Sequence, residues 1–334
     1  SRCLNSPEYT VRAANFFVPT PHTTMSIYSL LTGSYGDYRS RQKLSSGDAA
    51  NSIPAMLRNR GYGTYFLYSG PTYFEGLHEM LNGFGLTIIN KEKLEKLIDP
   101  ATGRPYKSFN WGVDDASLVQ ASAGILSRSS GPGLYFIGLS STHSPYFNPD
   151  PSRFSRFDNS TAEGRYRNSI DYEVRVIDML IETFMRHNSD TLFVIVSDHG
   201  ESFGQEGYSK HSFSLYNTEI CVPFIMLHSS FGRGITPFSG SIIDVYPALA
   251  DMMGISITSP VDGRSVFMRG YVPKLFLSSW RDGESKGLVY GSRKWIYSRR
   301  AGTLYEMKPD DSERIDLTGD PGKTSFVKFL GRQY

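Results

Sequence analysis

The sequence has few cysteines, no strong charge imbalance and no long apolar run. Its 334 residues include only two cysteines, Cys3 and Cys221, which excludes a disulfide framework and a cysteine-rich zinc site. The 35 basic and 33 acidic residues leave a net charge of +2, too balanced for a nucleic-acid-binding surface. No apolar run approaches the ~20 residues of a membrane-spanning helix, and no signal peptide is visible. We therefore expect a globular chain with no nucleic-acid partner.

What is present is an alternation of short apolar strands and helical segments. Strands are predicted where apolar runs end at Gly, Ser or Thr, in 61–70, 133–146, 191–201 and 222–230. Helices are predicted at 114–128 and within 164–189, where apolar residues recur every three or four positions. Strand, helix, strand in this order indicates an α/β fold with mostly parallel strands. The length suits one large domain, alone or with a small subdomain.

Polar residues capable of chemistry follow the predicted strands directly. His143 follows one strand, Asp198 and His199 follow "TLFVIV", and His211 lies in the Gly-rich loop after them. In open α/β sheets, ligands bind beyond the carboxyl ends of the strands. A carboxylate beside an imidazole suits a divalent metal. A capping Asp with a locally packed His explains the pair about as well on spacing alone.

A second stretch, "FVPTPHTTMSIYSLLTG" (17–33), predicts a helix that ends at Gly33. Thr23 or Thr24 would be its N-cap. The N-terminus of a helix attracts anions, and a hydroxyl there, close to a metal, can attack an ester phosphorus. Taken alone, the stretch is better explained by a plain threonine cap.

Together these stretches resemble the sulfatase-like branch of the alkaline phosphatase superfamily. The similar segments follow the family order along nearly the whole chain, and include "HTTMSIYSLLTG", "STHSPY", "SDHGESFGQEGYSKH" and "LYEMKPDDSERIDL". The resemblance implies an alkaline phosphatase/sulfatase-like sandwich, with a mostly parallel central sheet flanked by helices and a small C-terminal subdomain. It implies a catalytic domain at 1–270 and a subdomain at 271–334.

The resemblance also implies roles for individual residues. Thr23 matches the nucleophile, Asp198 and His199 match metal ligands, and His143 and His211 match histidines that hold the ester or serve the leaving group. Thr23 would also contact the metal. No separate cofactor-binding residue is implied. Of the neighbouring side chains, Glu201 would support the ligands without binding the metal, Lys210 would be solvated, and His22 and His78 would have packing or surface roles.

The sequence departs from true sulfatases at the nucleophile. Those enzymes convert a Cys or Ser to formylglycine, followed by a Pro and an Arg, whereas this chain has Thr23, with Met25 and Ile27 at the later two positions. Threonine cannot become formylglycine, so a sulfated Thr23 lacks the elimination route by which sulfate leaves. A phosphorylated threonine can still be attacked at phosphorus. This pattern resembles the phosphoglycerol and phosphoethanolamine transferases.

We therefore expect a metal-dependent hydrolase or transferase that forms a covalent intermediate on Thr23 and transfers a phospho-headgroup in envelope metabolism. The alternatives are a sulfuric ester hydrolase and an inactive domain that binds a glycan or lipid headgroup. One divalent metal ion is expected, Mn²⁺ or Zn²⁺ rather than Ca²⁺, because imidazole is a poor calcium ligand. The expected substrate is a small-molecule, lipid or glycan ester. The chain is expected to be monomeric and extracytoplasmic, and to reach the membrane only through a segment outside this sequence.

The beginning of the chain carries a further expectation. It opens on "SRCLNSPEYT" without Met, and no apolar run stands out before Thr23. Family members usually begin the domain with a buried strand that ends in an acidic metal ligand. We expect such a strand upstream of Ser1, and an unpaired edge beside the strand at 191–197. Asp37 and Glu8 are the acidic alternatives within the chain.

Overall fold

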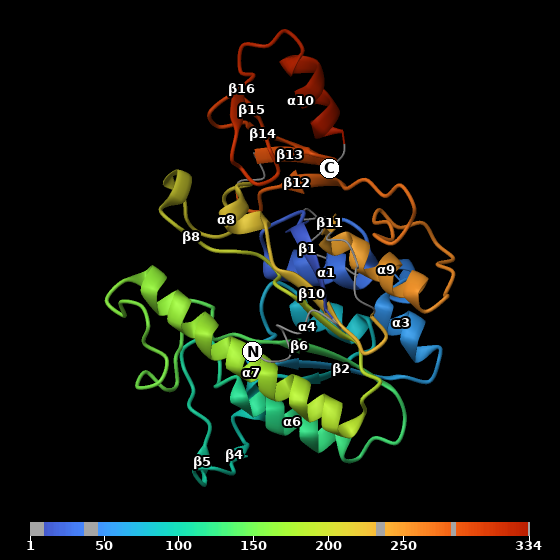
Figure 1. Ribbon diagram of the computed structural model, residues 1–334, viewed down its shortest axis with the longest axis vertical. Coiled ribbons are helices and arrows are strands. Elements are labelled where there is room, and N and C mark those ends of the chain that lie inside the picture. Colours follow the sequence, from blue (N-terminus) through green and yellow to red (C-terminus); the bar gives the residue numbers. More distant parts are fainter. Residues whose placement is uncertain (1–9, 37–45, 232–237, 282–284, 333–334) are drawn as a thin grey trace. The chain divides into compact units, whose positions relative to one another are not determined.

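The computed structural model describes residues 10–36, 46–231, 238–281 and 285–332 (Figure 1). The chain forms two compact units. The first unit centres on residues 54–193, and the second unit joins residues 11–53, 194–226 and 234–334. Asp37 and Glu8 lie outside the described residues. None of the described helices combines the length and apolarity needed to cross a membrane.

The first unit is built on a parallel sheet of three strands in the order β3-β2-β6. Its strands are β2 (Gly63–Tyr68), β3 (Thr87–Ile89) and β6 (Gly133–Gly138), and a small hairpin pairs β4 (Ile98–Asp99) with β5 (Arg104–Pro105). Its helices are α4 (Leu77–Gly83), α5 (Lys91–Leu94), α6 (Ala116–Leu126) and α7 (Ala162–His187), and most of α3 (Ile53–Arg58) belongs to it. The predicted strands at 61–70 and 133–146 and the helix at 114–128 are thus confirmed.

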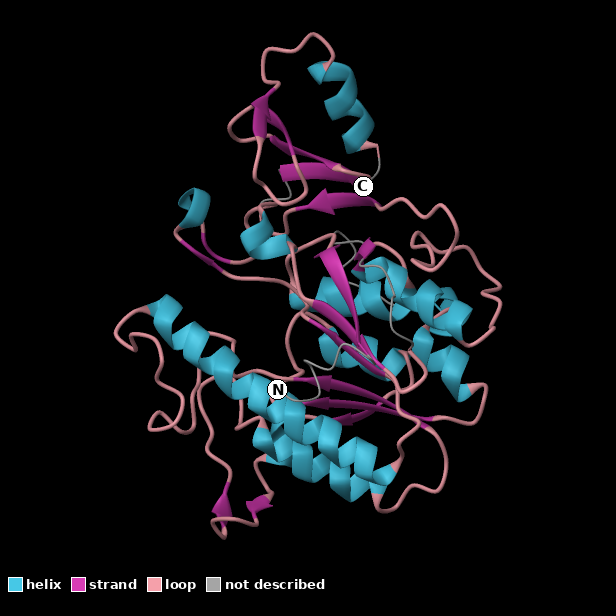
Figure 2. Ribbon diagram, in the orientation of Figure 1, coloured by secondary structure: helices cyan, strands magenta, loops and turns pink. Residues whose placement is uncertain are grey.

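Helices α6 and α7 lie side by side in the first unit (Figure 2). Thr161 caps α7 by accepting a hydrogen bond from the Gly164 N–H. Tyr172, Val176 and Phe184 of α7 are buried against apolar side chains of β6. Burial of this face, rather than helix propensity, stabilises such a helix in the fold.

The second unit contains a four-stranded sheet in the order β11-β1-β10-β7. Its strands are β1 (Thr10–Phe17), β7 (Phe193–Val196), β10 (Phe224–Leu227) and β11 (Phe238–Ser241), and β1 pairs with β11 in parallel. Beside it are α1 (Thr23–Thr32), α2 (Ser46–Ala50), α8 (Asn217–Ile220), α9 (Val245–Met252) and the 3-10 turn η2 (Ile242–Asp244). Predicted strands at 191–201 and 222–230 are confirmed, with shorter bounds.

Strand β1 was not predicted, whereas the open edge beside β7 was. The sequence showed no apolar run before Thr23, yet β1 lies there, because Val11, Phe16 and Phe17 are buried although polar residues separate them. Among the described strands β7 is hydrogen-bonded only to β10, so the expected open edge beside it is present. Helix α7 links β6 to β7 as predicted, but those two strands are not paired with each other.

The C-terminal part of the second unit is an antiparallel sheet of five strands in chain order. The strands are β12 (Lys274–Ser278), β13 (Ser285–Tyr290), β14 (Arg293–Ser298), β15 (Thr303–Met307) and β16 (Arg314–Asp316). Helix α10 (Lys323–Gly331) packs on this sheet through Phe326 and Leu330 (Figure 2). These elements occupy the stretch that the resemblance assigned to a C-terminal subdomain.

Candidate active site

Helix α1 places Thr23 at its first position, directly after a loop with two prolines. The N-cap is His22, in extended conformation (φ −156°), and no side chain caps the helix. The predicted cap at Thr23 or Thr24 is therefore wrong, because the chain turns into the helix one residue earlier. The Thr23 hydroxyl instead lies 3.2 Å from Nε2 of His199. The helix ends at Gly33 in the left-handed conformation (φ 68°), as predicted.

The neighbouring Thr24 faces the protein interior. It is 2% exposed, and its hydroxyl has no hydrogen-bond partner among the described residues. Of the two threonines, Thr23 is the one whose oxygen meets the residues after β7.

Asp198 and His199 stand at the carboxyl end of β7, where the apolar run stops. Asp198 Oδ2 lies 3.5 Å from Nε2 of His199, and its other oxygen accepts a hydrogen bond from the His199 N–H at 3.0 Å. The Nδ1 atom of His199 lies 2.9 Å from the Gly200 carbonyl oxygen. The local backbone thus fixes the imidazole with Nε2 directed at Thr23.

The electrostatics of this pair favour a neutral histidine beside an ionised aspartate. Burial lowers the pKa of the His199 imidazole, more than the charge of Asp198 raises it. Burial raises the pKa of Asp198, but the attraction of His199 when that imidazole is protonated, with hydrogen bonds from Thr23 and from the His199 N–H, outweighs it and holds the pKa below its ordinary value. A neutral imidazole and an ionised carboxylate are the forms that bind metals.

His211 returns to this place after a hairpin of β8 (Ser202–Phe203), the turn η1 (Gln205–Gly207) and β9 (Ser209–Lys210). Its ring stacks on that of His199 with centroids 3.9 Å apart. Its Nδ1 lies 2.7 Å from Oε2 of Glu201, whose side chain is 9% exposed. Glu201 therefore holds the His211 ring in place, in line with the supporting role expected for it.

The backbone on both sides of His211 is strained. Lys210 and Ser212 have φ values of 70° and 82°, in the left-handed region that non-glycine residues rarely adopt. The Ser212 hydroxyl donates to the Pro21 carbonyl oxygen at 3.0 Å, and its own carbonyl accepts from the N–H groups of Trp280 and Arg281. Ser212 thereby ties the His211 loop to the loop before Thr23.

Two substitutions of Ser212 distinguish the contribution of its hydroxyl to stability from the cost of its backbone conformation. Ser212→Ala should lower the free energy of unfolding by about 1–3 kcal/mol, since a buried carbonyl loses its partner. Ser212→Gly should lower the free energy of unfolding by about 1 kcal/mol less than Ser212→Ala does, because glycine adopts this φ without a Cβ penalty. Urea unfolding measures both, with Ser256→Ala, an exposed serine, as the control. An alanine variant at least as stable as the glycine variant would contradict this account.

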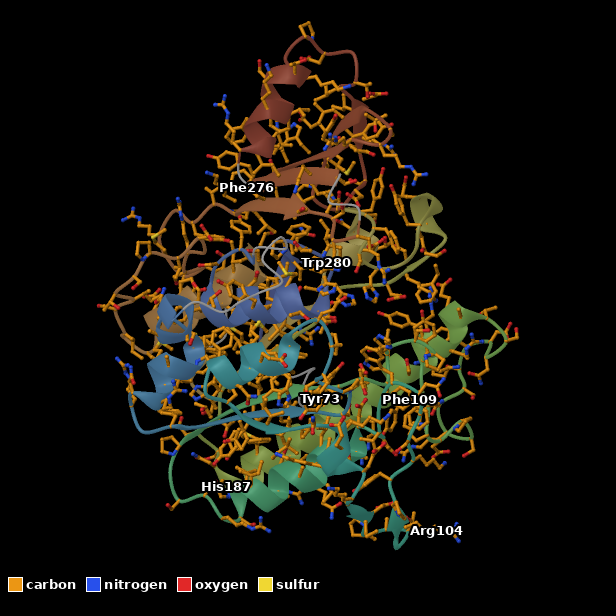
Figure 3. The ribbon with its side chains drawn as sticks, turned by 180° about the vertical axis from the view of Figure 1, so that it is seen from behind. Tyr73, Arg104, Phe109, His187, Phe276 and Trp280 are labelled. Carbon is orange, nitrogen blue, oxygen red and sulfur yellow. The ribbon has the colours of Figure 1, made fainter. Side chains whose placement is uncertain are left out.

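Trp280 packs on His22, the residue before Thr23. It follows β12, two residues beyond the last residue of that strand, and Figure 3 labels it together with Phe276 of the same strand. The ring of the buried His22 stacks on it at 4.1 Å. Packing is thus the role of His22. In the first unit His78 packs similarly, against the Tyr73 ring, and both histidines agree with the expectation.

The buried acid Glu219 holds the loop after His211 through hydrogen bonds. Glu219 is fully buried, and it accepts hydrogen bonds from the N–H groups of Phe213 and Ser214 and from the Ser202 hydroxyl. Burial raises its pKa despite these bonds. Sequence reasoning missed Ser212, Trp280 and Glu219, since no local pattern marks residues that act through contacts distant in the chain.

His143 lies in the first unit, apart in the chain from the other predicted residues. Its ring stacks on Trp111 with centroids 3.9 Å apart, and the Trp111 N–H donates to the Tyr68 hydroxyl. The backbone just before His143 is fixed by two acids. Asp115, fully buried, accepts from the N–H groups of Ser140 and Ser141, and Glu173 accepts from that of Thr142.

The second unit thus brings Thr23, Asp198, His199 and His211 together. The ligand atoms of His199, Glu201 and His211 lie within 4.8 Å of one another. Imidazole, carboxylate and hydroxyl donors converging in this way fit a divalent ion such as Zn²⁺. Asp198, His199 and Thr23 form the predicted set, and Glu201 is a further donor within reach.

The sequence and the fold both have known counterparts. Residues 5–255 match the family model named Sulfatase. The Δ4,5-hexuronate-2-O-sulfatase of Bacteroides thetaiotaomicron is 25% identical over 150 residues, which are 40% of this chain and 31% of that protein. The aligned part therefore spans about a third of the relative's length.

Solved structures of the alkaline phosphatase superfamily have the same fold. The lipoteichoic acid synthase LtaP of Listeria monocytogenes superposes with a TM-score of 0.71 and 15% identity, over 96% of this chain and 84% of its own. The C-terminal periplasmic domain of EptC from Escherichia coli, solved in complex with zinc, gives a TM-score of 0.61 and 15% identity, over 82% and 80% of the two chains.

Proposed function

The chain belongs to the sulfatase family, and we propose that within it this chain acts on phosphate esters through a covalent intermediate on Thr23. The observation that carries the proposal is the 3.2 Å approach of the Thr23 hydroxyl to Nε2 of His199, with Asp198 beside it. A threonine in this place can attack phosphorus, whereas it cannot form the aldehyde hydrate on which sulfate ester cleavage in the family depends.

The chemistry divides among the residues of the second unit. Asp198, His199 and Thr23 would hold the divalent ion, which when bound lowers the pKa of a neighbouring hydroxyl and offsets phosphate charge. The Thr23 oxygen forms a bond to phosphorus as the bond to the leaving alcohol breaks, and the hydroxyl proton passes to water. His211, held by Glu201, gives a proton to the leaving oxygen. In the second step it takes a proton from the attacking water or acceptor alcohol.

The named neighbours support a proposal for the transferred group and the setting. LtaP is a lipoteichoic acid synthase and the EptC domain is periplasmic. They support transfer of a phospho-headgroup in envelope metabolism, on the outer side of the cell membrane. The resemblance to the family assigns His143, stacked on Trp111 in the first unit, a role toward the substrate ester.

Turnover of three aryl esters tests the proposal. With Mn²⁺ or Zn²⁺ supplied, the chain should hydrolyse an aryl phosphate or a bis-aryl phosphate faster than the matching aryl sulfate. Faster cleavage of the sulfate would make the chain a sulfuric ester hydrolase, in keeping with its relative from Bacteroides. Metal binding without turnover of any ester would instead favour a domain that binds a glycan or lipid headgroup.

A further inference from the structure

Exposed apolar side chains gather in one short part of the second unit. Twelve large apolar side chains are exposed among the described residues, and five of them fall within 252–272. They are Met252, Met253, Phe267, Met268 and Val272. Single exposed apolar residues are ordinary on a protein surface, but a contiguous group marks a binding surface.

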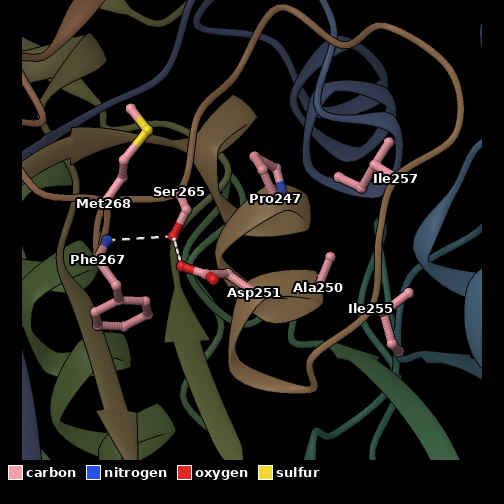
Figure 4. Close-up of a pocket in the computed structure, with 8 residues that line it drawn as sticks. All are labelled: Pro247, Ala250, Asp251, Ile255, Ile257, Ser265, Phe267 and Met268. Carbon is pink, nitrogen blue, oxygen red and sulfur yellow. Dashed lines mark hydrogen bonds between the residues drawn. The ribbon is translucent and has the colours of Figure 1, made fainter.

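A pocket of about 450 Å³ opens among these residues (Figure 4). Pro247 and Ala250 of α9 form its floor, Ile255 and Ile257 one wall, and Phe267 and Met268 the other. Its one acid, Asp251, accepts a hydrogen bond from the Ser265 hydroxyl at 2.6 Å. That bond joins α9 to the segment that carries Phe267, so the floor of the pocket is fixed to this wall.

The segment 263–274 beside the pocket has an unusual surface. Each of its exposed side chains is either a cation or large and apolar. The cations are Arg264, Arg269 and Lys274. The segment itself contains no acid, and the exposed Asp262 directly precedes it. A hydrogen bond from the Tyr271 N–H to the Met268 carbonyl closes a turn that begins at Met268 and has Arg269 and Gly270 at its tip. Apolar and cationic side chains are thus presented together.

We propose that this surface, named here the 252–274 patch, docks on the anionic surface of a lipid bilayer. Apolar side chains of this size enter the interfacial region of a bilayer, and nearby cations are attracted to its anionic headgroups. A second copy fits less well, because a two-fold interface would set the three cations of one copy against those of the other, and only Asp251 and Asp262 are acids in 251–274. The sequence predicted membrane contact only through a segment outside this chain, and the patch adds a contact of its own.

Vesicle sedimentation tests the patch with the whole chain. The protein should bind vesicles that contain phosphatidylglycerol more tightly than vesicles of phosphatidylcholine alone, and salt should weaken the binding. Arg269→Glu with Lys274→Glu should lower binding at least about fivefold for each cation. Phe267→Ser with Met268→Ser should lower it on both kinds of vesicle. Ile315→Ser and Arg300→Glu, an exposed apolar residue and an exposed cation elsewhere in the second unit, are the matched controls and should change nothing.

Unchanged thermal melts and aryl phosphate turnover would show that the patch variants are folded. Equal binding to the two kinds of vesicle, or binding that survives both double substitutions, would overturn the proposal. Sedimentation equilibrium without vesicles provides the other decisive result. A concentration-dependent dimer that Phe267→Ser with Met268→Ser dissociates would assign the patch to a second copy and also overturn it.

Discussion

Thr23→Ala should reduce turnover of aryl phosphates by at least about 10⁴-fold, as expected when a covalent nucleophile is removed. Its hydroxyl is the oxygen that approaches His199, and no neighbouring side chain can replace it in that position. The hydroxyl does not cap α1 but hydrogen-bonds beside Asp198 and His199, so its loss should lower the free energy of unfolding by about 0.5–1.5 kcal/mol. Steady-state kinetics and urea unfolding measure the two effects.

The adjacent threonine supplies the matched control. Thr24→Val keeps the shape of a buried side chain and removes a hydroxyl that has no partner among the described residues. It should retain activity, with stability unchanged or higher. Mass spectrometry of the protein quenched during turnover should locate the phosphate on Thr23. A phosphate on Thr24, or an active Thr23→Ala variant, would refute the assignment.

The end of β7 shows what the sequence can predict. A run such as "TLFVIV" is apolar on both faces, so it predicts a covered strand. The four residues of β7 are only partly buried, but the polar residues that follow it do lie at the strand's carboxyl end. That reasoning brings Asp198 and His199 to one edge of the sheet without any knowledge of the fold. The same reasoning missed β1, whose buried positions are Val11, Phe16 and Phe17, with Arg12 and Asn15 between them.

Helix α7 shows the limit of periodicity. The pattern of apolar residues predicted the helix, but it did not identify the buried face. Asn168 and Ser169 are buried whereas Ile170 is 36% exposed. Asn168 is buried because its amide donates to the Phe157 carbonyl and its oxygen accepts from the Phe157 N–H. Partners that lie outside the helix decide such positions, and a helical repeat does not contain that information.

The contacts of the loops around Thr23 could not be predicted for the same reason. Ser212 is separated from Pro21 by nearly two hundred residues. Its left-handed φ could not be predicted either, because this position holds a serine and not the glycine that usually marks such a conformation. Trp280 stacks on His22 across an even longer separation in the chain. The sequence therefore predicts candidate site residues that follow recognised strands, such as Asp198 and His199, and omits the groups that hold their loops in place.

Asp198→Asn and His199→Ala should each remove bound metal and activity together. Both side chains converge on the Thr23 hydroxyl, and each substitution deletes a donor that a neighbouring residue cannot supply. Replacing a residue that only supports a ligand costs about 10–100-fold in metal affinity, so deleting a ligand should cost more than about 100-fold. Metal content after gel filtration and turnover with added Zn²⁺ or Mn²⁺ measure the two losses.

His211→Ala and Glu201→Gln decide which donors hold the ion. If Asp198, His199 and Thr23 hold it, both variants should keep their metal, and His211→Ala should still lower turnover, by about 10²–10⁴-fold, through the lost proton donor. His228→Ala is the control, since this histidine pairs with Asp190 in the first unit. The ligand atoms of His199, Glu201 and His211 are also close enough to share an ion. Loss of metal from both variants, as complete as from Asp198→Asn, would place the ion among those three and leave Thr23 to act as a nucleophile beside it.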